Sequence, residues 1–146
     1  MIFAINSFRS MERTFKILSL SLGLILALSG VANAQNGEYD VFVPISKYIS
    51  QGDAESLSAW FADNLDISIG RGSNNCSKSQ ARQIIKSFFD NNQPRSFTIS
   101  HTAGKGNMKY AIGTLKTGGE TFLVTIFVNI DGNGYKMQHL KIETMP

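Results

Sequence analysis

Cysteine is almost absent from this chain, since Cys76 is the only one among 146 residues. No intrachain disulfide can form, and the paired cysteines or mixed cysteine and histidine sets that hold structural zinc are missing. Internal repeats and low-complexity tracts are missing as well. We therefore expect an ordinary globular domain held together by its core, with neither a metal nor a cofactor.

A long apolar run is also missing. The most apolar segment, Ile17 to Val31, has 15 residues and is interrupted by serine and glycine. A bilayer core requires about 20 apolar residues, so no transmembrane anchor is expected. Basic residues precede this segment, and the small-x-small pattern Ala32-Asn33-Ala34 follows it. This arrangement predicts a secretory signal peptide over residues 1–34 and a folded domain over residues 35–146, exported to the periplasm or secreted.

An excess of charge of one sign is absent from the predicted folded part. The whole chain has 14 basic and 11 acidic side chains, and residues 1–34 hold three of the basic and one of the acidic ones. The remaining 112 residues therefore carry 11 minus 10, or +1. A nucleic-acid-binding protein needs a concentrated basic face, so this class is excluded. The remaining length is enough for one domain that buries a core without disulfides.

Apolar periodicity divides residues 35–146 into helices and strands. Three segments have the spacing of amphipathic helices, and the first is Asp40–Gly52. The second is a short helix that Asp53 caps, with Leu57, Trp60 and Phe61 on one face. The third is Ala81–Phe89, which follows a Ser77–Gln80 capping box. Five segments are predicted to be strands: 65–69, 97–101, 108–117, 121–130 and 135–143. The first two alternate between apolar and polar residues, whereas 122–128 is apolar on both faces, which predicts a central strand. Residues 70–75 are predicted to form a loop. Helices that cover one face of an antiparallel sheet give an α+β domain.

The order of these elements is similar to the cone-shaped fold of nuclear transport factor two. Six short stretches resemble, more specifically, a small exported bacterial family known as domain of unknown function 4783: Gly52-Asp53-Ala54-Glu55-Ser56-Leu57, Ser79-Gln80-Ala81, Phe88-Phe89, Phe97 with His101, Ala111-Ile112-Gly113-Thr114-Leu115 and Leu140-Lys141-Ile142-Glu143. The resemblance implies a curved antiparallel sheet on about three helices, with a pocket at the open end of the cone. The wider fold includes isomerases, dehydratases, polyketide cyclases and binding modules, so it does not choose a function.

Five aromatic side chains are candidates for lining that pocket: Trp60, Phe61, Phe88, His101 and Tyr110. His101 is also the one candidate for catalysis. Its alternation with Phe97 and Ile99 places it on the face that points into the cone, where a neutral imidazole acts as a general base or orients a ligand. The alternative is a buried or edge histidine held by a hydrogen bond, and aromatic side chains at this spacing are core more often than ligand site.

Two further residues are weaker candidates. Cys76 precedes the third helix, whose N-terminus would lower the pKa of a thiol, but no base accompanies it in a motif. His139 is expected on the outer face of the last strand together with Tyr135 and Met137.

Three functions remain open. Because no coherent acid–base set is present, the leading hypothesis is a non-catalytic exported module that binds a small apolar or amphipathic ligand or a protein partner. The second is a small isomerase- or hydrolase-like enzyme that uses His101. The third is a structural homodimer that uses the outer sheet face of Tyr135, Met137 and His139.

Overall fold

The computed structural model describes residues 41–132 and 134–146. The predicted signal peptide, its cleavage pattern and the proposed helix cap Asp40 lie outside these residues. No helix within the two described ranges has the length and apolar character needed to cross a membrane.

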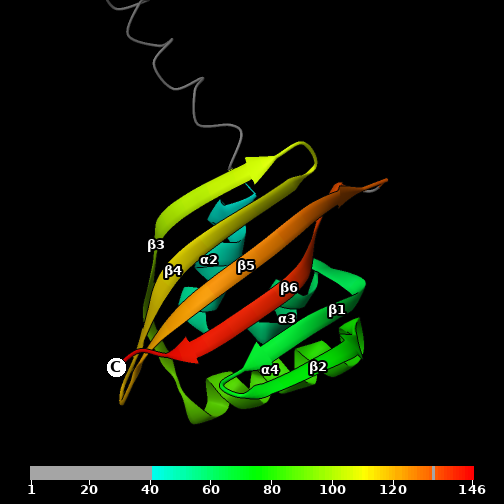
Figure 1. Ribbon diagram of the computed structural model, residues 1–146. Coiled ribbons are helices and arrows are strands. Elements are labelled where there is room, and N and C mark those ends of the chain that lie inside the picture. Colours follow the sequence, from blue (N-terminus) through cyan, green and yellow to red (C-terminus); the bar gives the residue numbers. More distant parts are fainter. Residues whose placement is uncertain (1–40, 133) are drawn as a thin grey trace, which may run out of the picture. The chain divides into compact units, whose positions relative to one another are not determined.

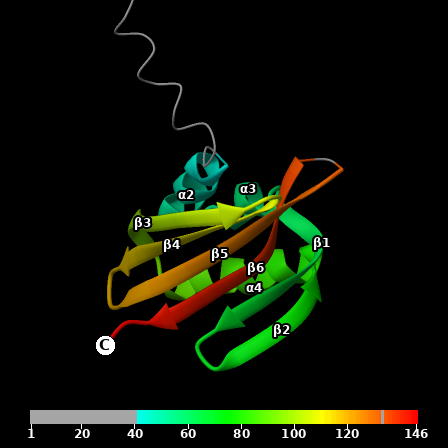
Figure 2. The ribbon, with the colours of Figure 1, turned by 45° about the horizontal axis from the view of Figure 1, so that its top comes forward.

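The described residues form a sheet with all of its helices on one side (Figures 1 and 2). The helices are α2 (Phe42–Gln51), α3 (Ala54–Ser58) and α4 (Lys78–Asn91). The strands are β1 (Phe61–Ile69), β2 (Gly72–Ser77), β3 (Pro94–Lys105), β4 (Met108–Thr117), β5 (Thr121–Asp131) and β6 (Gly134–Thr144). Their order across the sheet is β2-β1-β6-β5-β4-β3. The predicted α+β class is confirmed, with one addition: β1 and β6 pair in parallel, whereas the other neighbours are antiparallel.

Local capping explains where the helices begin and end. Gly52 ends α2 with φ of 66°, a left-handed conformation that glycine adopts without strain, and its N–H donates to the carbonyl oxygens of Ile49 and Tyr48. Asp53 then caps α3 by accepting from the backbone N–H and the hydroxyl of Ser56 at 3.0 and 2.7 Å. These bonds, the hydroxyl's above all, hold the pKa of the Asp53 carboxyl below its ordinary value. The abrupt change of direction between α2 and α3 is therefore encoded in two adjacent residues.

The capping box predicted for the third helix is confirmed. The Ser77 hydroxyl accepts from the Gln80 N–H at 3.3 Å, and the Gln80 side chain accepts from the Ser77 N–H at 3.1 Å. The apolar stripe of α4 then faces the sheet, with Ala81, Ile85 and Phe88 buried. This helix covers the part of the core that lies under β1 and β2.

Two element predictions are wrong. Trp60 and Phe61 do not continue the second helix, because the Trp60 carbonyl oxygen accepts a 2.7 Å hydrogen bond from Met137 N–H and draws the chain into the sheet. Residues 70–75 are not a plain loop, because Gly72–Ser77 forms β2 against β1. Only Cys76 of β2 is buried, so this polar strand has no apolar alternation by which to predict it.

The core fills the space between the sheet and the helices. On β5, every second side chain from Phe122 to Val128 is buried, which gives the period of two that a half-covered strand requires. The largest side chains with less than 2% exposure, or at that limit, come from both layers: Phe42, Ile45, Leu57, Phe61, Leu65, Ile67, Ile85, Leu115, Val124, Ile126, Met137 and Leu140.

A glycine on β4 makes room for an aromatic ring from β3. Gly113 faces the core, and the ring of Phe97 lies over it, so that a Cβ atom on Gly113 would be 2.5 Å from Phe97 Cζ. The glycine thus leaves room for a ring that closes the core at the sheet edge. Only hydrogen fits at this position without moving Phe97.

Candidate functional site

The face of the sheet opposite the helices carries a row of aromatic side chains, one from each of four neighbouring strands. Tyr110 pairs with Phe127 in the β4–β5 register, and Phe127 pairs with His139 in the β5–β6 register. Ring centroids are 5.7 Å apart in the first pair and 5.8 Å in the second. His101 on β3 extends the row, with its ring centroid 5.8 Å from that of Tyr110. We call His101, Tyr110, Phe127 and His139 the aromatic row.

A hydrogen bond lies at each end of the aromatic row. One joins two members of the row, and the other joins its last member to β1. The Tyr110 hydroxyl lies 3.4 Å from His101 Nε2. At the other end, His139 Nε2 lies 3.2 Å from the hydroxyl of Ser68 on β1, which in turn donates to the Ser73 hydroxyl on β2 at 3.3 Å. Side chains from all six strands therefore form one chain of contacts across the outer face.

A β-bulge places His101 on this face. The β3–β4 register shifts between Ile99, which pairs with Gly113, and His101, which pairs with Ile112. The extra residue reverses the alternation, so His101 does not share the inward face of Phe97 and Ile99 that its spacing predicted, and its side chain is exposed.

A second bulge acts in the same way on β6. Met137 pairs with Val128 and is fully buried, whereas His139 pairs with Phe127 on the outer face. The prediction that His139 lies outside is confirmed. The prediction that Met137 shares its face is wrong, since the residue inserted between them separates the two.

The five predicted pocket residues do not meet in one place. His101 and Tyr110 lie on the outer face, whereas Phe61 and Phe88 are buried among the core residues and Trp60 packs against that core. The Phe88 ring contacts the Phe122 ring edge to face, with centroids 5.1 Å apart. Phe88 thus packs against a core ring, and it also lines a hollow beside α4. Their role in ligand binding stays a prediction.

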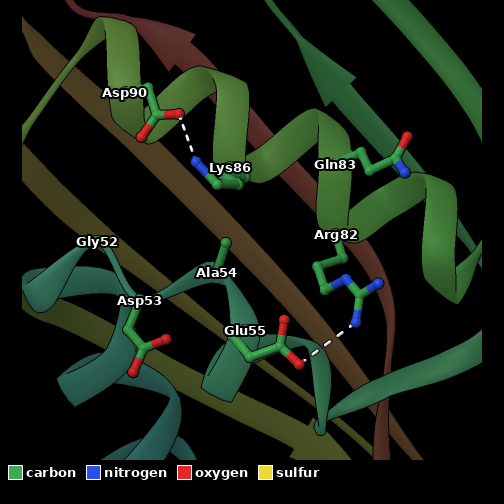
Figure 3. Close-up of a pocket in the computed structure, with 8 residues that line it drawn as sticks. All are labelled: Gly52, Asp53, Ala54, Glu55, Arg82, Gln83, Lys86 and Asp90. Carbon is green, nitrogen blue, oxygen red and sulfur yellow. Dashed lines mark hydrogen bonds and ion pairs between the residues drawn. The ribbon is translucent and has the colours of Figure 1, made fainter.

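A small cleft between the α2–α3 junction and α4 is the second candidate site (Figure 3). Its volume is about 250 Å³, below the roughly 300–1,000 Å³ of ordinary small-molecule sites. Arg82 reaches across it to Glu55 at 3.3 Å, and Lys86 binds Asp90 at 2.8 Å along α4. Both cations drawn in the cleft therefore already have a carboxylate partner, and the Arg82–Glu55 ion pair joins α4 to α3.

The chemistry of Cys76 differs from the sequence-based expectation. The thiol is buried and donates to the Leu65 carbonyl oxygen at 3.7 Å. Burial, with a smaller contribution from the Asp66 carboxylate, raises the pKa of the Cys76 thiol. The helix N-terminus does not make it a reactive thiolate, because desolvation acts more strongly.

We expect the Cys76 thiol to react about a hundredfold more slowly with Ellman's reagent at pH 8 in the folded domain than in concentrated urea, because only the thiolate reacts and the folded site disfavours it. The raised pKa also predicts a loss of stability as the pH rises above 9.0, the ordinary thiol value. Stopped-flow labelling measures the first effect. Equal rates in both conditions would contradict the burial that the structure assigns to this residue.

The described ranges contain no group of three or more histidine, cysteine, aspartate or glutamate side chains that could hold a metal ion.

Comparison with known structures identifies the fold class. A protein of unknown function from Cytophaga hutchinsonii, described as NTF2-like (nuclear transport factor two-like), is 10% identical, with a TM-score of 0.56 over 78% of this chain and 95% of that chain. A curved sheet with helices on one face is thus the NTF2-like fold, and the predicted resemblance is confirmed at this level.

The family follows from a closer match. The profile described as Domain of unknown function (DUF4783) matches residues 42–143, and the chain belongs to this family. A member from Bacteroides ovatus is 23% identical, with a TM-score of 0.69 over 71% of this chain and 94% of that chain. A member from Bacteroides uniformis is also 23% identical, with a TM-score of 0.69 over 70% of this chain and 95% of that chain. In both relatives the crystallised chain consists almost entirely of the part that matches this domain. No curated protein matches the sequence.

Proposed function

We propose that this protein is an exported, non-catalytic module that binds a protein partner through the outer face of its sheet. The observation that carries the proposal is the aromatic row, which crosses a sheet face that no described helix covers. Export rests on the signal peptide predicted for residues 1–34.

The composition of the outer face supports this choice. Between Met108 and Lys116, the outward side chains of β4 are Tyr110, Ile112 and Thr114, and none is charged. The outward side chains of β5 carry no charge from Thr121 to Asn129. On the neighbouring β6, the outward Lys141 and Glu143 form an ion pair with each other at 3.2 Å. An uncharged surface with aromatic side chains beside polar and charged groups has the composition of a protein–protein interface.

The enzymatic alternative has less support. His101 has one polar neighbour, the Tyr110 hydroxyl, and both lie on an open face where water reaches the imidazole. General acid–base catalysis gains from a site that encloses the substrate and holds a second group against it. The Ser68–His139 contact lies on the same open face, so neither histidine lies in a site that encloses a substrate.

Site-specific photocrosslinking in the native host tests the proposal. A benzoylphenylalanine in place of Thr125, at the centre of the outer face, is expected to give a covalent adduct of higher mass. The same residue in place of the exposed Gln83 on α4 is the matched control and is expected to give none. The mass of the uncrosslinked chain is expected to correspond to a start at Gln35.

The distribution of adducts decides between the alternatives. Adducts from position 83 alone, or from neither position, would refute binding through the outer face. An adduct from position 125 with twice the mass of the chain would identify the partner as a second copy and favour the homodimer. A chain that retains residues 1–34 in the host would refute export.

A further inference from the structure

We infer that the partner is a protein that presents an acidic segment to the β3–β4 side of the outer face. This inference rests on the proposed function and names the chemistry of the partner at the same surface. It starts from the distribution of charge along the chain.

The β3–β4 hairpin and its flanks lack acidic residues. From Asn91 to Gly119 the sequence contains no aspartate or glutamate, although it contains Arg95, Lys105, Lys109 and Lys116. Lys109 points into the domain, where it is buried with its Nζ 5.8 Å from the centroid of the Tyr135 ring. The other three cations are exposed. The hairpin is therefore positively charged on its solvent side.

Three cations elsewhere in the described residues have carboxylate partners, in contrast to these three. Arg82, Lys86 and Lys141 form ion pairs with Glu55, Asp90 and Glu143, respectively. Within the part of the chain that the structure describes, Arg95, Lys105 and Lys116 have no carboxylate within ion-pair distance. Since no internal carboxylate neutralises them, they remain available to an external one.

The register fixes where these charges lie relative to the aromatic row. Lys105 pairs with Met108 at one end of the hairpin, and Lys116 pairs with Ser96 at the other. Along β4, Lys116 lies eight positions after Met108, which corresponds to about 27 Å at 3.4 Å per residue. Tyr110 and Ile112 lie between the two ends. The surface thus fits a segment with carboxylates at its ends and apolar side chains in its middle.

The orientation of the rings favours a protein over an anionic polysaccharide. The planes of Tyr110 and Phe127 are 35° apart, and those of Phe127 and His139 are 28° apart. At the centroid separations of 5.7 and 5.8 Å, two rings cannot lie flat side by side, so each covers part of its neighbour's face. A sugar ring needs an open aromatic face to stack on, whereas a protein side chain packs equally well against ring edges.

Binding of charged polymers to residues 35–146 tests the inference directly. The probe is a fluorescein-labelled random copolymer of glutamate and tyrosine, with alginate as the anionic polysaccharide. The double variant Lys105→Glu/Lys116→Glu is compared with Lys47→Glu/Lys78→Glu, which changes the net charge equally on the helix side. We expect the first variant to weaken copolymer binding about tenfold and the second to change it less than about twofold. Fluorescence anisotropy gives both values.

Three outcomes would overturn the inference: no binding of the copolymer, equal weakening by both variants, or tighter binding of alginate that the Lys105→Glu/Lys116→Glu variant abolishes. The crosslink at position 125 in the host separates this failure from that of the proposed function. Loss of the adduct in Lys105→Glu/Lys116→Glu and its retention in Lys47→Glu/Lys78→Glu supports the inference. Retention in both refutes the acidic partner while leaving the outer face as the binding surface. Unchanged circular dichroism melting shows that each variant is folded.

Discussion

Replacement of Phe61 by alanine is expected to lower the free energy of unfolding by about 4 kcal/mol. Phe61 is the first residue of β1 and is 1% exposed among the core residues. Truncation removes its buried apolar surface and leaves a cavity that the surrounding side chains fill only in part. Because domains of this size are stable by roughly 5–15 kcal/mol, the loss is a large fraction of the total. Denaturation of residues 35–146 by urea measures it.

The exposed Val43 on α2 provides the control. Its side chain is 68% exposed, so Val43→Ala is expected to change the free energy of unfolding by less than about 0.5 kcal/mol. A loss below about 1 kcal/mol for Phe61→Ala would contradict close packing around the ring. Phe61 would then line an open pocket, as the sequence-based hypothesis proposed.

Replacement of Gly113 by alanine is expected to cost about 3 kcal/mol, the upper part of the usual range for overpacking. The added methyl group would lie 2.5 Å from Phe97 Cζ and 2.9 Å from the Thr98 carbonyl oxygen. The ring must leave its position, and the core at the β3 edge opens. Urea denaturation of the variant and of the parent domain gives the difference.

A double-mutant cycle separates the clash from other effects. In a Phe97→Ala background the main obstacle is gone, so Gly113→Ala is expected to cost at least about 1 kcal/mol less than it does beside Phe97. Gly119→Ala is the control, because no atom lies within 4 Å of its Cβ position. Equal costs of Gly113→Ala in both backgrounds would show that Phe97 is not the obstacle.

Much of this fold could be predicted because its elements carry local signals. The capping box at Ser77 marks the start of α4, and the run of apolar and β-branched residues from Phe122 to Val128 marks β5 as a strand. The turn glycines near residues 106 and 118 separate the strands of the meander. The family resemblance then supplied the order in which such elements assemble.

The errors arise where the local signal is absent or where one residue is inserted. Strand β2 has one buried side chain, so its pairing with β1 leaves no trace in its hydropathy. The bulges near His101 and Met137 each change the parity of a strand. Alternation with a period of two does not reveal such an insertion. The residues before the bulge and the residues after it each alternate regularly, and the sequence does not show that the two sets have exchanged faces.

The candidate site is harder still to predict than the fold. The aromatic row draws one residue from each of four strands, and no two of them are neighbours in the sequence. Only the strand register brings them together. The acid-free stretch from Asn91 to Gly119 is visible in the sequence, but it acquires meaning only once Lys105 and Lys116 are placed on the outer face.

The position of β6 has a consequence for how the chain is made. β6 lies between β1 and β5, and Ile67 of β1 pairs with Leu140 of β6. The first strand can therefore pair with this neighbour only after the last strand has been synthesised. Within the sheet, only β6 joins β1 to β5, so these two parts of the sheet cannot be joined before the final residues leave the ribosome, and such distant pairing slows folding. His139 on β6 also joins Phe127 to Ser68. A premature stop codon near the C-terminus would therefore remove the fold and the binding face together.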